Sequence, residues 1–343
     1  MNNPFTDWAW TPHADWLQIE TIDMHTGGEP LRVIVSGLPQ LQGTNCLEKR
    51  RWFRDNLDHV RTALMWEPRG HADMYGTVMD RSTDGDFDVF FLHNEGYSTM
   101  CGHAILALTR LAAETGLVEP EREEIVFNVP CGRIVARPHW QGGRVASASF
   151  RNVPSYVALA GASVDVPGIG PVAFDIAYGG AYYALVEAAP LGLAIEPADH
   201  DRLIDHGRRI KHAVAAAFPV IHPTEPDLSF LYGTIFTGPP RNPAHHSRNV
   251  CIFADGEVDR SATGSGVSAR AALHFSRGEI GVGEEIVIES ILDTTMTVKV
   301  AETTRFGPHD AVIPQVRGSA SFTGRNSFWI EPDDALRGGF LLR

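Results

Sequence analysis

Short runs of apolar residues, separated by Gly, Pro and Asp, dominate the pattern of the chain. Runs rich in Val, Ile, Phe and Tyr that are bounded by such residues are typical of β-strands. They predict strands at residues 31–35, 87–92, 124–129, 145–150, 171–176, 182–186, 229–232, 249–253 and 285–289. Apolar residues recur at helical spacing in residues 49–65, 101–115, 197–218 and 263–277. Because few helices separate the strands, the pattern predicts an α+β fold with mostly antiparallel sheets.

Two of the helical segments resemble each other. Residues 101–116 align without a gap with residues 263–278, so that Cys101 corresponds to Thr263. A glycine directly follows the last helical residue of each segment, which is a common signal for a helix end. The offset (263 − 101 = 162) is about half of the 343 residues. We interpret the two segments as an internal duplication that gives two similar domains, each with one such helix.

The composition is that of an ordinary globular protein, and its most informative feature is the negative net charge. Hydrophobic residues make up 43% and charged residues 21%, which excludes a disordered chain and a coiled-coil rod. Lys and Arg number 29 and Asp and Glu number 42, so the formal charge is −13. An acidic chain does not attract a phosphate backbone, so nucleic acid is not an expected partner.

The sequence shows no membrane or secretion signal. Its start lacks the basic and apolar segments of a signal peptide, and no run of 18 apolar residues occurs. Four cysteines are present, and none of them shows the CxxC spacing of zinc or redox sites. We expect a cytoplasmic protein with reduced thiols and no membrane partner.

Cys101 stands at the start of a predicted helix, where a thiol can be reactive. The free N–H groups and the positive dipole end of a helix stabilise anions. Such a position lowers the pKa of a cysteine from about 8.5 into roughly the 3.5–7.5 range, although a buried, inert cysteine is the alternative. If both helix starts face one cleft, Cys101 would act as a base on the α-proton of a carboxylic acid, with Thr263 on the opposite face. The carboxylate would then be bound by the N–H groups of Gly102, His103, Gly264 and Ser265.

Several segments together carry a family resemblance. They are residues 22–30 (IDMHTGGEP), 100–103 (MCGH), 129–132 (VPCG) and 259–266 (DRSATGSG), with a weaker match at 322–324 and Phe340. In this order they resemble the proline racemase superfamily, which is related in fold to diaminopimelate epimerase. The resemblance implies two domains, each a central helix wrapped by mostly antiparallel sheet, with the active site in the cleft between them. The implied domains are residues 1–160, joined by 318–343, and residues 161–317.

One position departs from the racemases and 4-hydroxyproline epimerases of this superfamily, which have two catalytic cysteines. The second position here is Thr263, whose hydroxyl is weak unless a neighbouring base activates it. Epimerisation needs an acid/base group on each face of the substrate. The pair of Cys101 and Thr263 therefore resembles the branch of the trans-3-hydroxy-L-proline dehydratases. In that substrate the α-hydrogen and the 3-hydroxyl lie on one face, so a syn elimination of water would give Δ1-pyrroline-2-carboxylate.

Three alternatives stay open. The first is a 4-hydroxyproline 2-epimerase or proline racemase with an unusual second residue. The second is a cysteine hydrolase that uses Cys101 with a distant histidine. The third is an imino-acid-binding protein with a degenerate site.

The resemblance assigns further roles. Asp259 is expected to pair with the ring ammonium of the substrate, and the alternative is a loop carboxylate that caps the amides of Ser261 or Thr263. His103, like the other residues at the two helix starts, is expected to contact the substrate carboxylate, and the alternative is simple packing. No role follows for the signature residues His25, Gly27 and Gly28.

Other chemistry is not expected. Cys131 precedes a glycine but no helical run, so it is predicted to be a structural thiol, as are Cys46 and Cys251. No histidine pair shows the spacing of a metal site, and the GxGxxA pattern at residues 264–269 lacks the context of a dinucleotide fold. We expect no metal and no cofactor, a small imino acid as the partner, and a homodimer as a candidate assembly.

Overall fold

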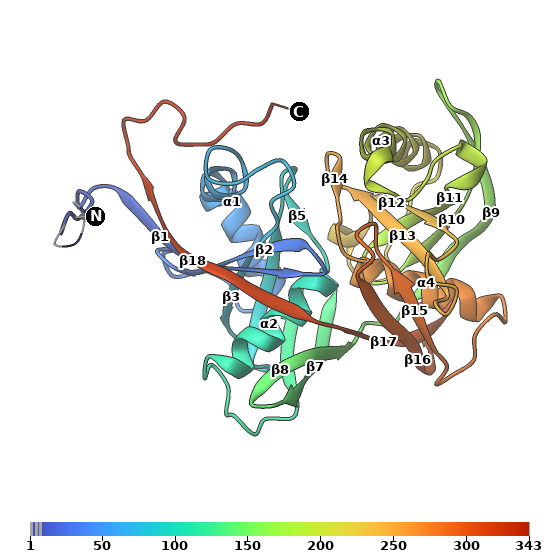
Figure 1. The fold of residues 1–343 in the computed structure, drawn as a ribbon, viewed down its shortest axis with the longest axis horizontal. Helices are drawn as coiled ribbons and strands as arrows, with labels where there is room; N and C mark the ends of the chain where they lie inside the picture. Colours follow the sequence, from blue (N-terminus) through green and yellow to red (C-terminus); the bar gives the residue numbers. More distant parts are fainter. Residues whose placement is uncertain (1–2, 4–5, 7–8, 343) are drawn as a thin grey trace.

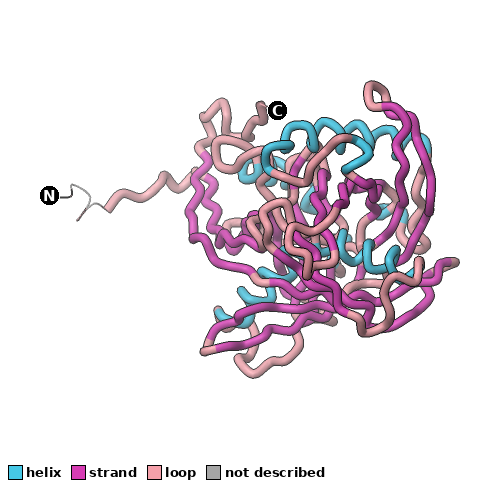
Figure 2. Tube along the Cα trace, turned by 45° about the vertical axis from the view of Figure 1, so that its right-hand side comes forward, coloured by secondary structure: helices cyan, strands magenta, loops and turns pink. Residues whose placement is uncertain are grey.

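The computed structural model describes residues 3, 6 and 9–342. Residues 1, 2, 4, 5, 7, 8 and 343, which the predicted first domain includes, lie outside the described residues. Two lobes lie side by side, one containing α2 (Gly102–Glu114) and the other α4 (Gly264–Ser276) (Figure 1). Strands make up most of both lobes, and few helices lie among them (Figure 2).

The first lobe surrounds α2. Its other elements are β1 (Leu17–Thr26), β2 (Glu29–Ser36), α1 (Cys46–Met65), β3 (Gly76–Arg81), β4 (Phe87–Leu92), β5 (Tyr97–Ser98), β6 (Ile125–Val129), β7 (Gly132–Gln141), β8 (Arg144–Arg151) and β18 (Ala320–Ile330). Strand β1 pairs antiparallel with both β18 and β2, while β2 runs parallel to β3 and β4 runs parallel to β6. The chain therefore returns to the first lobe at its C-terminal strand.

The second lobe repeats this arrangement around α4. Its other elements are β9 (Tyr156–Val166), β10 (Gly170–Tyr178), β11 (Tyr182–Glu187), η1 (Ala189–Leu191), η2 (Pro197–Asp199), α3 (His200–Ala217), η3 (Pro226–Leu228), β12 (Leu231–Gly238), β13 (Ser247–Phe253), β14 (Glu257–Val258), β15 (Glu285–Glu289), β16 (Thr295–Phe306) and β17 (His309–Gly318). Strand β11 runs parallel to β12 and β13 to β15, as their counterparts do in the first lobe. The other ladders between described strands are antiparallel, and β17 joins the lobes by pairing with β8.

These features confirm an α+β fold with mostly antiparallel sheet and two similar halves. The repeated order of parallel and antiparallel pairs is the result that an internal duplication requires. The domain boundaries at residues 160 and 317 stay a prediction.

The two central helices are buried on nearly all sides. Eleven of the 13 residues of α2 and ten of the 13 of α4 are buried, and the buried residues of α4 include the polar Ser268 and Arg270. The outer helix α3 buries one stripe only, at Leu203, Gly207, Ile210 and Val214. The central helices can therefore hold their first residues firmly at the boundary between the lobes.

The sequence pattern missed several long strands. Strand β18 has one buried residue at each end and none between them, so it does not show the alternation of a half-buried strand and periodicity could not find it. The first half of β16 does alternate, with Met296, Val298 and Val300 buried, and this signal was missed. The helix predicted at 197–218 begins at His200, because residues 197–199 form a 3₁₀ turn.

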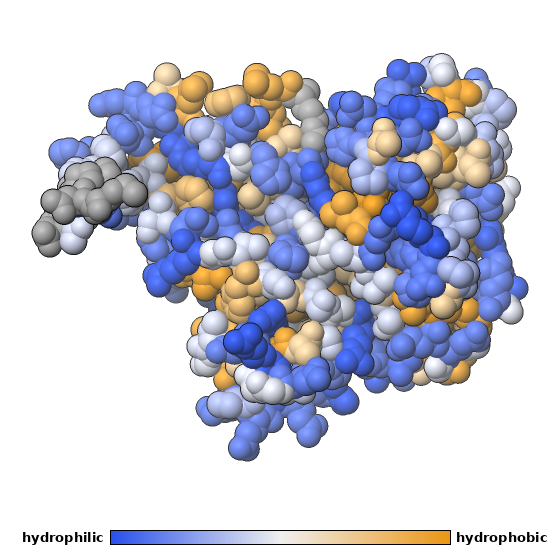
Figure 3. Space-filling model, in the orientation of Figure 1, coloured by the Kyte–Doolittle hydropathy of each residue, from blue (hydrophilic) through white to orange (hydrophobic). Residues whose placement is uncertain are grey.

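The surface agrees with the acidic, polar composition. Hydrophilic residues cover much of the face shown in Figure 3, interrupted by separate hydrophobic patches. Within the described part of the chain, no helix is long and apolar enough to cross a membrane.

Candidate active site

The N-termini of α2 and α4 touch at the boundary between the lobes. A Cβ atom on Gly102 would lie 2.5 Å from Cα of Gly264, and a Cβ on Gly264 would lie 2.7 Å from Cα of Gly102. No side chain fits at either position, so both must be glycine for the helices to approach this closely. The positive ends of the two helix dipoles therefore converge on one point, which favours a bound anion there.

A small cavity lies at this junction. The structure brings all seven of the predicted site residues to its lining, namely Cys101, Gly102, His103, Asp259, Thr263, Gly264 and Ser265. The lining also contains Tyr75, Met100, Tyr183, Tyr232, Cys251 and Phe253. The cavity volume is about 20 Å³, which is room for about one water molecule. A larger ligand therefore requires the lobes or the lining side chains to move apart.

Cys101 is the residue that precedes α2, and its thiol is buried. The thiol makes no capping hydrogen bond to the helix, and Sγ lies 3.1 Å from Nδ1 of His103. Burial raises the pKa of Cys101 well above its ordinary value, and the charges of Asp259 and Glu29 add to this, while the Ala104 N–H lowers it. The prediction of a lowered pKa was therefore wrong for this buried site, because loss of water outweighs the helix N-terminus.

His103 lies against the thiol. Burial lowers the pKa of His103, so the ring is neutral near pH 7 and one of its nitrogens can accept a proton. The ring edge packs on Tyr75, with 4.9 Å between the ring centroids. The His103 ring thus contacts the Cys101 sulfur, while its backbone N–H lies at the helix start, and the contact of His103 with a substrate carboxylate stays a prediction.

Thr263 occupies the matching position before α4. Its backbone has a φ of 62°, which is unusual for a β-branched residue and is found mainly where a site requires it. The hydroxyl Oγ1 is buried and has no hydrogen-bond partner among the described residues. The Thr263 side chain interacts with the thiol of Cys251, whose pKa is raised well above its usual value by burial, so this thiol does not activate the hydroxyl as a base.

Asp259 is held by the loop that leads to Thr263. Its Oδ1 accepts hydrogen bonds from the N–H of Ser261 over 2.8 Å and from its hydroxyl over 2.7 Å. The Ser261 hydroxyl in turn accepts the N–H of Thr263 over 3.1 Å. The capping role considered from the sequence is thus present at Oδ1, while Oδ2 receives no hydrogen bond from the described residues and remains available to a ligand.

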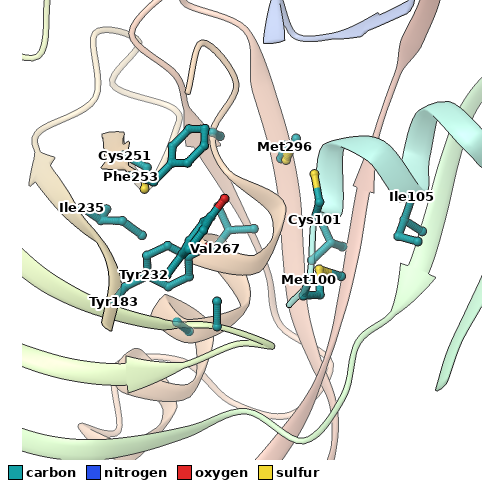
Figure 4. Packing of buried hydrophobic residues seen from close by; sticks show 14 of the residues in the cluster. Met100, Cys101, Ile105, Tyr183, Tyr232, Ile235, Cys251, Phe253, Val267 and Met296 are labelled. Carbon is teal, nitrogen blue, oxygen red and sulfur yellow. The ribbon is translucent and has the colours of Figure 1, made fainter. Parts of the chain in front are cut away.

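An aromatic wall faces Cys101, and sequence reasoning missed it. Figure 4 shows Met100 and Cys101 on one side and Tyr183, Tyr232 and Phe253 on the other. The rings of Tyr232 and Phe253 stack with 5.3 Å between their centroids, and the hydroxyls of Tyr183 and Ser265 are 2.7 Å apart. No spacing rule connects these residues, because the strands that carry them meet only in the fold. The wall excludes water and strengthens electrostatic interactions at the thiol.

The remaining cysteines lie apart from the reacting groups, with one exception. Cys46 and Cys131 lie in other parts of the first lobe, whereas Cys251 is fully buried in β13 and lines the cavity. The four cysteines are free thiols. Among residues 3, 6 and 9–342, no cluster of three or more His, Cys, Asp or Glu side chains is arranged to hold a metal ion.

A buried thiol between two opposed helix N-termini, with a carboxylate nearby, is an arrangement that can bind a small anion and exchange a proton with it. A family model described as proline racemase matches residues 21–341. The chain therefore belongs to the proline racemase family.

Individual relatives and one crystal structure are similar to the chain over nearly its whole length. A Colwellia psychrerythraea protein named trans-3-hydroxy-L-proline dehydratase is 49% identical over 97% of this chain and 96% of its own. A Burkholderia multivorans protein named 3-hydroxyproline 2-epimerase is 43% identical over 95% of this chain and 98% of its own. The crystal structure of a hydroxyproline epimerase from Agrobacterium vitis with bound trans-4-hydroxy-L-proline has a TM-score of 0.88, at 28% identity over 95% of this chain and 96% of that one. This similarity confirms the predicted fold class.

Proposed function

We propose that this protein dehydrates trans-3-hydroxy-L-proline to Δ1-pyrroline-2-carboxylate. The observation that carries the proposal is the asymmetry of the two helix starts. Cys101 has a proton acceptor 3.1 Å away, whereas the Thr263 hydroxyl has no described hydrogen-bond partner. A single acid/base group suffices for a syn elimination, while epimerisation needs one on each face. The Colwellia relative of the same length supports this choice.

The site residues suggest how the substrate is held. The first N–H groups of each helix have no partner within the helix, so those of Gly102, His103, Gly264 and Ser265 are the proposed carboxylate site. Asp259 Oδ2 is the proposed partner of the ring ammonium. Both interactions draw electron density away from Cα and stabilise the charge that develops when the α-proton leaves.

The proposed reaction proceeds on one face of the ring. Transfer of the thiol proton to His103 gives the Cys101 thiolate, which removes the α-proton. The electron pair of the Cα–H bond forms the double bond between Cα and C3, and the C3–O bond breaks. The hydroxyl leaves as water with a proton returned from Cys101 or His103. The enamine product tautomerises to the cyclic imine, and Thr263 lines the opposite face without taking part in proton transfer.

The proposal also includes the predicted domain boundaries, substrate class and cellular location. We propose a two-domain enzyme, with domains at 1–160 plus 318–343 and at 161–317, that acts on a small imino acid in the cytoplasm. The four free thiols and the acidic composition support a reducing compartment. A homodimer stays a prediction.

Proton NMR in heavy water tests the proposal. The purified protein is incubated with trans-3-hydroxy-L-proline, and in parallel with trans-4-hydroxy-L-proline and L-proline. We expect the signals of the 3-hydroxy compound to be replaced by those of the cyclic imine, with no exchange in the other two samples. A protein that leaves the 3-hydroxy compound unchanged would contradict the proposal.

The second candidate is epimerisation at Cα, which the name of the Burkholderia multivorans relative favours. It predicts incorporation of deuterium at Cα and inversion with the hydroxyl retained. The same NMR samples separate the two candidates, because dehydration removes the C3 hydroxyl and epimerisation keeps it.

A further inference from the structure

The turn between β1 and β2 contains the HTGGEP signature, to which the sequence assigned no role. Gly27 and Gly28 have φ angles of 60° and 94°, which glycine adopts without strain. Thr26 Oγ1 donates a hydrogen bond to the carbonyl of His103 over 2.8 Å. The Gly27 carbonyl accepts one from Thr294 Oγ1, in the second lobe, over 3.1 Å. The turn therefore connects the start of α2 to the opposite lobe.

The same turn packs directly on the loop that carries Asp259. A Cβ atom on Gly27 would lie 3.3 Å from Cβ of Ser261, and one on Gly28 would lie 3.4 Å from Cβ of Arg260. These distances leave no space between the two segments, so a shift of the turn would move the loop.

Glu29 follows the two glycines and is completely buried. Its Oε2 accepts the backbone N–H of Arg260, the residue after Asp259, over 2.8 Å. Its Oε1 is buried without a hydrogen-bond partner among the described residues. Burial, and then the charge of Asp259, raise the pKa of Glu29 well above its usual range. The hydrogen bond to the N–H of Arg260 is therefore the contact that links Glu29 to the loop of Asp259.

The second lobe contains a matching turn that lacks this group. Gly179, Gly180 and Ala181 join β10 to β11, and Tyr182, which pairs with Tyr178 as Glu29 pairs with Thr26, occupies the position of Glu29. A Cβ on Gly180 would lie 2.7 Å from Cβ of Met100, next to Cys101. Each turn thus packs beside the helix start of the other lobe, but a buried carboxyl occurs only beside the loop of Asp259.

We propose that Glu29 is a positioning residue that holds Asp259 at a fixed place opposite Cys101 by accepting the N–H of Arg260. The inference rests on the proposed function, in which Asp259 binds the ring ammonium of the imino acid. Glu29 does not line the cavity, so it acts through the loop and not on the substrate itself.

The test compares two ligands that differ at the ammonium. L-proline has a carboxylate and a ring ammonium but no 3-hydroxyl, and cyclopentanecarboxylate has only the carboxylate and the ring. Dissociation constants are measured by NMR titration for the wild type and for Glu29→Met, Glu29→Asp and Glu29→Gln. Met removes the acceptor, Asp withdraws it by one methylene, and Gln keeps an acceptor oxygen on a neutral group of the same length.

We expect Glu29→Met and Glu29→Asp to weaken L-proline binding by roughly tenfold or more, as for loss of a hydrogen bond to a charged group. Binding of cyclopentanecarboxylate should change by less than about twofold, and Glu29→Gln should bind both ligands within about twofold of the wild type. A purely structural defect would weaken both ligands together. Glu114→Met is the matched control, because Glu114 Oε1 accepts the N–H of Val145 over 2.7 Å far from the cavity; it should leave both constants unchanged.

A folded Glu29→Met or Glu29→Asp variant that binds L-proline as the wild type does, or that loses both ligands equally, would overturn the inference. If Glu29→Met does not fold, the Asp and Gln variants carry the comparison. If the Glu29 variants bind the two ligands as expected but the wild type does not dehydrate the 3-hydroxy compound, the proposed reaction alone is refuted. A wild type that dehydrates this compound while the Glu29 variants bind normally would refute the positioning role alone.

Discussion

Replacement of Gly102 by alanine tests whether the close approach of the two helix starts matters for catalysis. The added Cβ would lie 2.5 Å from Cα of Gly264 and 2.8 Å from its carbonyl carbon. Carbon atoms in contact are separated by about 3.5–4.0 Å, so the helix starts must move apart by about 1 Å. The φ of Gly102 lies outside the left-handed region, and alanine favours a helix by about 1 kcal/mol over glycine. The clash is therefore the dominant effect.

The expected loss is larger in activity than in stability. Overpacking of this kind costs about 1–3 kcal/mol of folding free energy, which a chain of this size tolerates. A displacement of about 1 Å at the reacting groups costs roughly 100-fold in kcat/KM, or about 2.7 kcal/mol of transition-state stabilisation. Both quantities can be measured on one preparation, by NMR rates with trans-3-hydroxy-L-proline and by urea unfolding.

The matched control is Gly324→Ala in β18. A Cβ there meets no atom within 4 Å, so kcat/KM should stay within about twofold of the wild type. A folded Gly102→Ala variant with kcat/KM within about threefold of the wild type would refute the argument that the helix starts must touch. Equal losses in both variants would show that the effect does not come from the junction.

Three further predictions concern thiols and the facing hydroxyl. Cys101→Ala should lower the dehydration rate by at least about 1,000-fold while the urea midpoint stays within about 0.5 M, since it removes the base; a near-normal rate would exclude Cys101 as the base. Thr263→Cys should add deuterium exchange at Cα with inversion, measured by NMR in heavy water, and its absence would show that Thr263 does not face the substrate. Burial raises the pKa of Cys46 to about 12, whereas an unfolded thiol ionises near pH 8.5. Stability should therefore fall as the pH rises from about 8.5 to about 12, and Cys46→Ala should reduce this fall when unfolding by urea is compared at about pH 8 and about pH 11; an unchanged pH dependence would contradict the assignment.

Periodicity and residue types predicted the fold class because strand-like runs are many and few helical segments separate them. The alignment of residues 101–116 with 263–278 identified both helices and their shared start, and α2 and α4 begin one residue after Cys101 and Thr263. The exposed ribbon β18 was not predicted, because its residues between the two ends have no buried face and pair only with a neighbouring strand.

Some residues of the candidate site could likewise be predicted from the sequence, and others could not. The residues at the helix starts follow from local sequence, since a helix N-terminus and its first residues are one continuous segment. The aromatic wall of Tyr183, Tyr232 and Phe253 does not follow from local sequence, because three separate strands, β11, β12 and β13, bring it together. The raised pKa of Cys101 also depends on this wall and on burial, and no single segment determines how closely the lobes shut.

The duplication explains why the scaffold is symmetric while the chemistry is not. With the offset of 162 residues, Cys101 corresponds to Thr263 and His103 corresponds to Ser265. In the first lobe the third residue approaches the thiol and can accept its proton. In the second lobe the third residue is turned toward Tyr183 instead, and the hydroxyl of Thr263 has no hydrogen-bond partner among the described residues. The pair of a thiol and an imidazole therefore occurs on one face only, whereas both helix starts carry the glycine that lets them approach. This asymmetry fits the proposed reaction, in which protons are removed and returned on the side of Cys101.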